Sequence, residues 1–345
     1  MKKINIAVSG INATDNPGPG IPVAKSLRQS DLNCQLIGLS YDINDPGHYL
    51  DNYLDCSFLL PYPTKGWKGI KTRLEYIKEH QGLDVVIPCL DVELPMYIKY
   101  ADQLNEMGIA TYLPDMKSFE LRNKANLTDV AKSINSVYPT TWKVYSLDEL
   151  IDICEEEDFP LVIKGPYYKA YVVYNIDAAK KYYHSLSEEW GFPVLVQKVV
   201  SGEELNVVGV GDGEGGSLGM VIIRKQSVTD IGKVWSAVTI KNDDILESAE
   251  AFIKEYKWKG PFELEYIVNQ KSIQLIEINP RFPAWVYFAT GLGINLPERV
   301  VKLMLNVPFD RDSDYQPGML YMRFTDEVVC NTSSLQNLIT HGGNK

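Results

Sequence analysis

Short apolar runs separated by helix-like segments are the feature that most restricts the fold of this chain. Three runs near the N-terminus are rich in β-branched residues and lack polar alternation, as is typical of strands buried on both faces: INIAVSG (4–10), CQLIGLS (34–40) and LDVVIPCL (83–90). Between and after them lie the helix-like segments PVAKSLRQ (22–29), GIKTRLEYIKEH (69–80) and ELPMYIKYADQLNEMG (93–108). This alternation predicts βαβ units in an open parallel sheet over residues 1–115.

The rest of the chain predicts two further lobes in which helices pack on mostly antiparallel strands. A small lobe over residues 116–198 combines short strands with expected helices at 124–133, 147–156 and 178–189. A C-terminal lobe over residues 199–345 carries longer strands: ELNVVGVG (204–211), GSLGMVIIRKQ (216–226), FELEYIV (262–268) and IQLIEIN (273–279). The predicted fold class is α/β, with a Rossmann-like N-terminal domain followed by two α+β lobes.

Charge and composition exclude several classes of protein. Among 345 residues the acidic side chains outnumber the basic ones, and the net charge of −11 argues against general affinity for nucleic acid or an anionic membrane. Five scattered cysteines without a CxxC pair favour a reducing compartment, and no apolar run approaches the length that spans a bilayer. The expectation is a cytoplasmic protein. The sequence does not determine an oligomeric state.

A glycine-rich turn, INATDNPGPGIP (11–22), follows the first predicted strand. Glycines between a first strand and a first helix suggest phosphate binding, and Asp42 ends the second strand where a ribose-binding acid would stand. An NAD(P)-dependent oxidoreductase is therefore one hypothesis. The spacing does not match GxGxxG, and prolines interrupt the turn, so a tight structural or substrate-facing turn is the alternative.

Acidic residues lie on one face of two adjacent predicted strands. FELEYIV and IQLIEIN are separated by NQKS, which predicts a hairpin. Alternate residues share a face, so Glu277, Asn279 and Arg281 point the same way. If the polar faces coincide, Glu263 meets Glu277 across the hairpin with Asn279 beside it. Such an all-oxygen set suits Mg²⁺, and Arg281 could stabilise developing negative charge.

This hypothesis requires a particular register. Glu263 can oppose Glu277 only if paired positions sum to an even number, which needs a loop with an odd number of residues or a bulge. A plain two-residue loop would place Glu263 opposite Ile278. The alternative interpretation is the exposed polar face of an edge hairpin.

Two lysines of the small lobe are candidates for binding phosphate. Lys124 opens a predicted helix in ELRNKANLTDV, and Lys164 ends the apolar strand in FPLVIKGP. Most lysines are simply solvated, but an ammonium that ends a buried strand emerges at the edge of a cleft. Two of them could hold nucleotide phosphates as point charges. In QKVVSGEEL, strand backbone groups could bind an adenine edge and Glu204 could bind ribose hydroxyls.

With these residues identified, the chain resembles the ATP-grasp superfamily, in particular its carbamoyl-phosphate-synthase-like branch. The strongest match is FELEYIVNQKSIQLIEINPRFPAWVYFATGLGINLPE (262–298), which is similar to the metal-binding strands of the family and the segment after them. FPLVIK, QKVVSGEEL and RNKANL match the nucleotide-binding lobe, and IPCLDVELP matches the end of the leading domain. The resemblance extends to about residue 310. It implies a pre-ATP-grasp domain followed by a two-lobed ATP-grasp fold.

The resemblance also implies how nucleotide would be bound. It assigns Lys124 and Lys164 to the ATP phosphates and Glu204 to the ribose. It assigns three residues to the adenine hinge: Gln197, Lys198 and Val199.

For the chemistry, the resemblance assigns Glu263, Glu277 and Asn279 to one or two Mg²⁺ ions, with Mn²⁺ as an alternative. Arg281 would stabilise the transferred phosphoryl group and the intermediate. Arg224 or Lys225 would face the phosphates or the acyl substrate. The implied reaction is ATP-dependent joining of a small-molecule or peptide carboxylate to an amine through an acyl phosphate.

One segment departs from the family. The family has a flexible loop rich in glycine and serine after the lysine that ends this strand, whereas this chain reads KGPYYKAYVVYN (164–175). Lys169 could replace backbone amide donors with a charge, or the loop could serve a substrate. The third alternative is a catalytically weak or inactive nucleotide-binding regulator.

Overall fold

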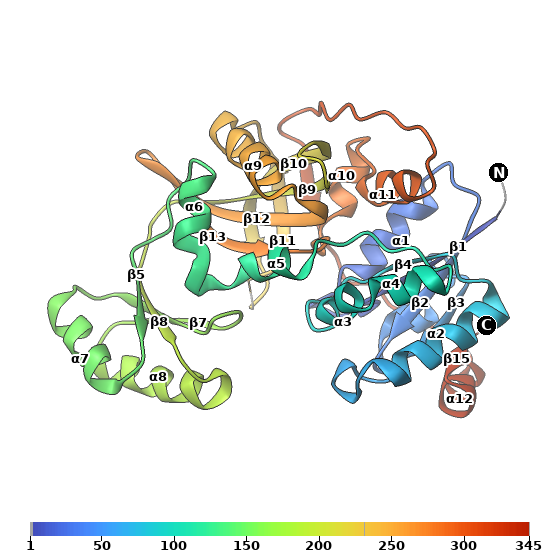
Figure 1. Ribbon diagram of the computed structural model, residues 1–345, viewed down its shortest axis with the longest axis horizontal. Coiled ribbons are helices and arrows are strands. Elements are labelled where there is room, and N and C mark those ends of the chain that lie inside the picture. The colour runs from blue at the N-terminus through green and yellow to red at the C-terminus, as the bar shows by residue number, and fades with distance from the viewer. Residues whose placement is uncertain (1–2, 231, 345) are drawn as a thin grey trace.

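The protein is described by a computed structural model that covers residues 3–230 and 232–344. Three sheets form three parts: an N-terminal domain, a small lobe and a C-terminal lobe that lies between them (Figure 1). The predicted α/β fold class is confirmed. No helix in the described residues is long and apolar enough to cross a membrane.

The N-terminal domain contains a parallel sheet of order β3-β2-β1-β4. Its strands are β1 (Ile4–Ser9), β2 (Cys34–Ser40), β3 (Cys56–Leu59) and β4 (Val85–Ile87). Its helices are α1 (Gly20–Arg28), η1 (Pro46–Tyr49), η2 (Pro63–Lys65), α2 (Trp67–Gln81), α3 (Leu94–Lys99) and α4 (Ala101–Glu106). The βαβ alternation predicted this part, apart from the four-residue strand β3.

The small lobe is a four-stranded antiparallel sheet, β5-β8-β6-β7, covered by two helices. Its elements are β5 (Thr141–Val144), α7 (Leu147–Glu156), β6 (Leu161–Lys164), β7 (Ala170–Val173), α8 (Ile176–Trp190) and β8 (Val194–Lys198). Its core consists of buried residues between positions 144 and 196 only. The lobe therefore has an independent core.

The C-terminal lobe is built on a six-stranded antiparallel sheet, β13-β12-β9-β10-β11-β14. The strands are β9 (Glu203–Asp212), β10 (Ser217–Val228), β11 (Val234–Thr239), β12 (Lys259–Asn269), β13 (Ser272–Asn279) and β14 (Leu320–Met322). One face packs on α6 (Leu127–Ser133) and α9 (Asp243–Tyr256). At one end of the other face lie α10 (Tyr287–Gly291) and α11 (Leu296–Met304), which join the core of the N-terminal domain.

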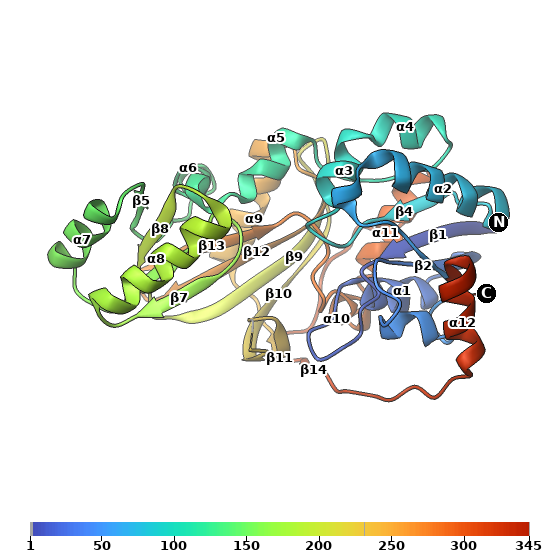
Figure 2. The ribbon, with the colours of Figure 1, turned by 90° about the horizontal axis from the view of Figure 1, so that it is seen from below.

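The structure divides the chain differently from the expected boundaries at two places. Residues 116–138, expected in the small lobe, include α5 (Met116–Phe119), η3 (Glu120–Arg122), η4 (Lys124–Asn126) and α6, and α6 packs in the core of the C-terminal lobe. At the other end, α12 (Thr332–His341) leaves the C-terminal lobe and lies beside the N-terminal domain (Figure 2). β15 (Gly343–Asn344), which follows it, pairs with β3 and thus belongs to the N-terminal sheet.

The glycine-rich turn between β1 and α1 is closed by its own backbone. Gly18 N–H donates to Asn12 O at 2.8 Å, and Gly20 N–H donates to Gly10 O at 3.0 Å. A Cβ on Gly20 would lie 2.2 Å from Ser9 O, and one on Gly18 would lie 2.3 Å from Gly10 O. Because these glycines permit close backbone packing and their N–H groups already have acceptors, the turn does not form a phosphate cradle. This favours a structural turn over a dinucleotide site.

We expect Gly20→Ala to lower the free energy of unfolding by about 1–3 kcal/mol or more, because the new methyl group would overlap a strand carbonyl. The matched control is Gly291→Ala in α10, where a Cβ would meet no heavy atom within 4 Å. The control should change stability by less than about 0.5 kcal/mol. Urea unfolding of the two variants tests this, and equal stabilities would contradict it.

Candidate active site

The polar faces of β12 and β13 coincide, as predicted, but the register is shifted by two residues from the expected one. Glu263 opposes Asn279, and Glu265 opposes Glu277. The turn holds only Gln270 and Lys271, and the required parity comes from a β-bulge that leaves Ile276 unpaired between Glu265/Glu277 and Tyr266/Leu275. The expectation that Glu263 opposes Glu277 was wrong. The acid opposite Glu277 is Glu265.

Glu263 is enclosed by side-chain donors. Its carboxylate accepts hydrogen bonds from Asn206 Nδ2 at 2.7 Å, Trp285 Nε1 at 2.6 Å and Asn279 Nδ2 at 3.1 Å. Burial, together with the negative charge of Glu265, raises the pKa of Glu263 to about 7. This acid is therefore held within the protein and has little oxygen left for an external partner.

Glu265 and Glu277 instead face lysines. Lys225 Nζ lies 2.6 Å from a Glu265 oxygen, and Lys124 Nζ lies 3.3 Å from a Glu277 oxygen. Burial disfavours the charge of Glu265, but the ammonium of Lys225 outweighs it and lowers the pKa of this acid. Lys225 also lies 3.3 Å from Glu204, so the expected ribose-binding acid is adjacent to the cluster.

The donor set available to a metal consists of oxygen only. Glu265 and Glu277 supply carboxylates, and Asn279 donates to both Glu263 and Glu265 through Nδ2, which leaves its Oδ1 toward Arg281. No group of three acidic, histidine or cysteine side chains in the described part of the chain is placed to hold an ion alone. Two carboxylates and an amide fit Mg²⁺, which commonly binds through one or two carboxylates and substrate phosphates.

Arg281 joins the cluster to the N-terminal domain. Its Nε donates to Asp91 at 2.9 Å and its Nη2 donates to Asn279 Oδ1 at 3.3 Å. Burial opposes the positive charge, but the carboxylates of Asp91 and Glu263 raise the pKa of Arg281. Asp91 is thus the ion partner of Arg281. Its neighbour Glu93 is a buried acceptor for Ser9, Tyr41 and two backbone N–H groups.

Lys164 ends β6 with its ammonium buried in the small lobe. Nζ donates to Gln197 Oε1 at 2.5 Å, and Gln197 donates in turn to Thr141. Burial, assisted by the positive charge of Lys124, lowers the pKa of Lys164 to about 8. The interaction with Gln197 shows that this predicted hinge residue uses its side chain to orient a lysine.

The lowered pKa of Lys164 predicts a pH dependence of stability. Between pH 8 and 10.5 the unfolded chain keeps a proton that the folded chain has lost, so the free energy of unfolding should rise with pH. Relative to Lys164→Met, the wild type should gain roughly 1 kcal/mol per pH unit in this window. Urea unfolding of both proteins at pH 7, 8, 9 and 10 measures the difference. A difference independent of pH would contradict the prediction.

The loop that departs from the family closes against Lys124. The carbonyl of Tyr167 accepts from Lys124 Nζ at 2.5 Å, and Pro166 O accepts from the backbone N–H of Lys124. Tyr167 and Tyr168 pack against Trp190. Lys124 is therefore bound by backbone oxygen in the position where the resemblance expects phosphate.

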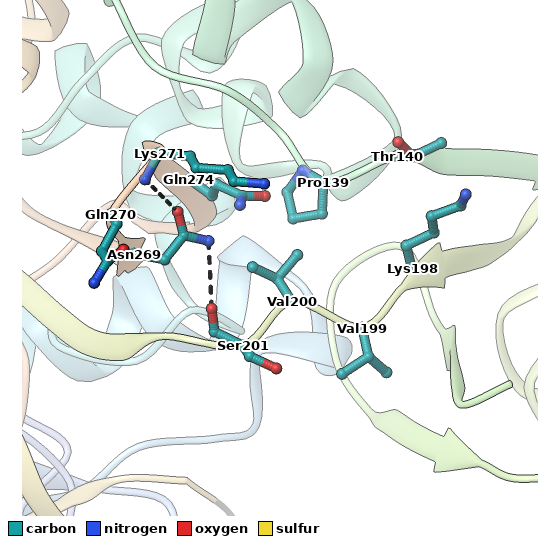
Figure 3. Close-up of a pocket in the computed structure, with 10 residues that line it drawn as sticks. All are labelled: Pro139, Thr140, Lys198, Val199, Val200, Ser201, Asn269, Gln270, Lys271 and Gln274. Carbon is teal, nitrogen blue, oxygen red and sulfur yellow. Dashed lines mark hydrogen bonds between the residues drawn. The ribbon is translucent and has the colours of Figure 1, made fainter. Parts of the chain in front are cut away.

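A hollow of about 550 Å³ lies at the hinge between the two lobes. It is lined by Pro139, Thr140, residues 198–201, the β12–β13 turn and Gln274 (Figure 3). Val199, predicted for the adenine hinge, lies here. The residues of the acidic cluster do not line this hollow, so the candidate site is defined by its carboxylates and lysines.

Three predicted residues point away from the cluster. Each forms an ion pair on the surface: Lys169 with Glu189 at 2.5 Å, Lys198 with Glu157 at 2.6 Å and Arg224 with Glu203 at 2.9 Å. Because Arg224 and Lys225 are neighbours on a strand, only one can face the cluster, and that residue is Lys225. In this structure Lys169 pairs with α8, and the suggestion that it supplies a charge over the phosphates stays a prediction.

The residues that sequence reasoning missed are Glu265 and Asp91. Glu265 was recognisable as sharing a face with Glu263, but the bulge that decides between them has no clear sequence signal. Asp91 lies 190 residues from Arg281 in the chain, so no spacing could have paired them.

The fold defines a class of architecture: a parallel N-terminal domain followed by a small antiparallel lobe and a larger antiparallel sheet. A family model described as "ATP-grasp in the biosynthetic pathway with Ter operon" matches residues 192–326. The carbamoyl phosphate synthase large chain of Clostridium acetobutylicum is 24% identical over 199 residues, which are 53% of this chain and 18% of that one. That of Pyrococcus furiosus is 25% identical over 226 residues, 60% of this chain and 21% of that one.

Solved structures agree on the fold. N5-carboxyaminoimidazole ribonucleotide synthetase from Thermus thermophilus has a TM-score of 0.66 at 14% identity, covering 91% of this chain and 81% of that one. The biotin carboxylase domain of Hydrogenobacter thermophilus 2-oxoglutarate carboxylase has a TM-score of 0.68 at 15% identity, covering 92% and 73%. L-amino acid ligase from Bacillus licheniformis has a TM-score of 0.63 at 16% identity, covering 88% and 74%. The chain has the ATP-grasp fold, and the resemblance stated from its sequence is confirmed.

Proposed function

We propose that this protein is an ATP- and Mg²⁺-dependent ligase that joins a carboxylate to an amine. The observation that carries the proposal is a pair of charged networks on opposed strands. Lys124 pairs with Glu277. Opposite it, Lys225, Glu265, Asn279 and Arg281 are connected in series. Such a set of cations and oxygen ligands provides positioning and charge neutralisation, which are the main requirements of phosphoryl transfer.

Each part of the cluster has a role in this proposal. Lys164, from the small lobe, and Lys124, directly before α6, bind the phosphates of ATP. Glu265, Glu277 and Asn279 would hold Mg²⁺, which when bound neutralises phosphate oxygens and polarises the transferred group. Arg281 stabilises the negative charge that develops beside the acyl substrate.

The proposed reaction has two balanced steps. A carboxylate oxygen of the acid attacks the γ-phosphorus of ATP, and the bond to the β–γ bridging oxygen breaks to release ADP. The amine then attacks the acyl carbon, loses a proton, and displaces inorganic phosphate. No side-chain nucleophile is needed, because the protein positions both substrates and stabilises charge.

The names of similar proteins support a ligase. Two structural neighbours are named as a synthetase and a ligase: N5-carboxyaminoimidazole ribonucleotide synthetase and L-amino acid ligase. The sequence relatives are named carbamoyl phosphate synthase. The chain spans only about a fifth of the carbamoyl phosphate synthase large chains that it matches, namely 18% and 21%. The individual substrates of those proteins therefore do not transfer to this one.

A nucleotide-binding regulator without turnover is the second candidate function. The observation that favours it is the carbonyl of Tyr167 on Lys124 Nζ, because the loop must move before that lysine can bind phosphate. The two candidates share nucleotide binding and differ in ADP formation.

A screen for ADP and phosphate release tests the proposal. Amino acids, small carboxylic acids and short peptides are supplied singly and in pairs with ATP and Mg²⁺, and ATP binding is measured in parallel by calorimetry. The ligase predicts ADP release that depends on both an acid and an amine. ATP binding without ADP release from any pair would favour the regulator, and absence of ATP binding would contradict both.

A further inference from the structure

A cluster of cations lies where the C-terminal lobe meets the N-terminal domain. β11 pairs with β14 so that the backbone N–H of Arg323 donates to Trp235 O at 2.9 Å. Lys233, directly before β11, is close enough to Arg281 and Arg323 for the charges of both to act on it. Arg323 Nη2 also donates to Ala284 O at 2.9 Å, in the turn that begins at Arg281. Three cationic side chains thus converge on one region.

The N-terminal domain borders this region from the opposite side. Pro17 O, in the glycine-rich turn, accepts from Lys233 Nζ at 3.0 Å, and Asp91 pairs with Arg281. Burial, reinforced by the charges of Arg281 and Arg323, lowers the pKa of Lys233 to about 8. An anion at this place would relieve the repulsion among the three cations.

Several buried polar atoms of this region have no hydrogen-bond partner within the described chain. Arg323 Nε and Nη1 are donors without acceptors, and the Oδ1 atoms of Asp91 and Asn16 are acceptors without donors. Leaving a buried polar atom unpaired costs about 1–3 kcal/mol, and more for charged groups. A ligand that presents an anion to Arg323 and an N–H donor to Asp91 would satisfy these atoms together.

The surrounding carboxylates do not supply that anion. Glu263 and Glu277 also act on Arg281, but Lys225 acts on the first and Lys124 pairs with the second. Asp91 is the acid whose negative charge acts on Lys233. One carboxylate therefore balances the charge of three cations. This positive charge adjoins the proposed metal ligands through Arg281, which donates to Asn279 Oδ1.

We propose that the acid substrate of this protein carries a second anionic group, which Arg323 and Lys233 bind while the reacting carboxylate faces Arg281. This inference rests on the ligase function proposed above and adds the chemical class of its substrate. Asp91 binds an N–H donor of the same molecule. The expected class is an acidic amino acid or a phosphorylated amino acid, in which both anions and an ammonium group occur together.

Binding of matched amino-acid pairs to the full-length protein tests the proposal. Calorimetry without nucleotide compares L-glutamate with L-glutamine, L-aspartate with L-asparagine, and O-phospho-L-serine with L-serine. In each pair the second anionic group is present in one member only, and the two acid–amide pairs are also matched in shape. At least one anionic member should bind about tenfold or more tightly than its neutral partner, as expected when a buried charged donor would otherwise stay unpaired. The pair that shows the effect distinguishes a carboxylate from a phosphate.

Variants locate the effect. Arg323→Gln should reduce the preference to less than about threefold, Lys233→Gln should reduce it partly, and Arg323→Lys should keep part of it because the charge remains. The matched control is Arg311→Gln, which removes an exposed arginine paired with Asp212 outside the cluster and should keep the full preference. Thermal unfolding shows whether each variant is folded. If Arg323→Gln does not fold, Lys233→Gln still tests the preference.

Two results would overturn the proposal: no anionic member binds better than its neutral partner, or the preference survives in Arg323→Gln. Mg²⁺-ATP binding is measured separately and should be unchanged in Arg323→Gln. If the wild type does not bind ATP or does not release ADP, the ligase function is refuted, but the amino-acid preference can still be measured. The two failures are therefore distinguishable.

Discussion

Arg281→Ala is expected to lower the rate of ADP release by about 10³-fold or more, because a guanidinium beside a transferred phosphoryl group commonly contributes that much. Glu277→Gln should cause a comparable loss and weaken the dependence on Mg²⁺, since an amide is a poorer ligand for this ion than a carboxylate. Initial rates of ADP release at saturating ATP measure both effects, with the best acid and amine from the screen.

Controls separate chemistry from folding. Arg281→Ala also leaves Asp91 without its ion partner, so Arg281→Lys is included to keep a positive charge there. Arg224→Ala removes a neighbouring surface arginine that pairs with Glu203, and its rate should equal that of the wild type. Turnover close to that of the wild type in folded Arg281→Ala or Glu277→Gln would remove the proposed mechanism.

The second prediction with a large expected effect concerns which of two acids on β12, Glu263 or Glu265, binds Mg²⁺. Glu265→Gln should raise the Mg²⁺ concentration required for half-maximal rate by about 10²-fold, or lower the rate by that factor, because Glu265 stands opposite Glu277. Glu263→Gln should change either quantity by less than about tenfold. Its oxygens are already bound by Asn206, Asn279 and Trp285, and an amide resembles the protonated acid that its raised pKa favours.

A Mg²⁺ titration of ADP release at pH 7 and pH 8 compares the two variants directly. The opposite order, with Glu263→Gln as the severe variant, would mean that the bulge at Ile276 does not set the working register. Thermal unfolding is needed in parallel, because Glu263 contributes to a buried network whose loss can reduce stability.

The hairpin shows how far the sequence could predict this site. Alternation along the two strands predicted that Glu277, Asn279 and Arg281 share a face, and parity showed that a two-residue turn requires a bulge. Alternation cannot say where a bulge lies, because many positions of the hairpin would restore the same parity. The identity of the opposing acid, Glu265, therefore needed coordinates.

Longer-range features were harder still. Periodicity predicted the parallel sheet and most helices of the first two parts. It could not predict that β15, only two residues long, would return to the N-terminal sheet, or that Asp91 would pair with Arg281. For the lysines, residue type alone did not separate Lys124 and Lys164, whose ammonium groups are buried, from Lys169 and Lys198 on the surface.

The return of the C-terminus has a consequence for motion. The N-terminal domain and the C-terminal lobe share one hydrophobic core and are joined a second time where β15 adds to β3, whereas the small lobe has a core of its own. Because the N-terminal domain and the C-terminal lobe are connected at two places, they cannot easily move apart. We therefore expect the space between the small lobe and the C-terminal lobe to open and close by rotation of the small lobe alone. Its two connections to the rest, near Pro139 and near Ser201, are then the pivots, and they flank the hinge hollow (Figure 3).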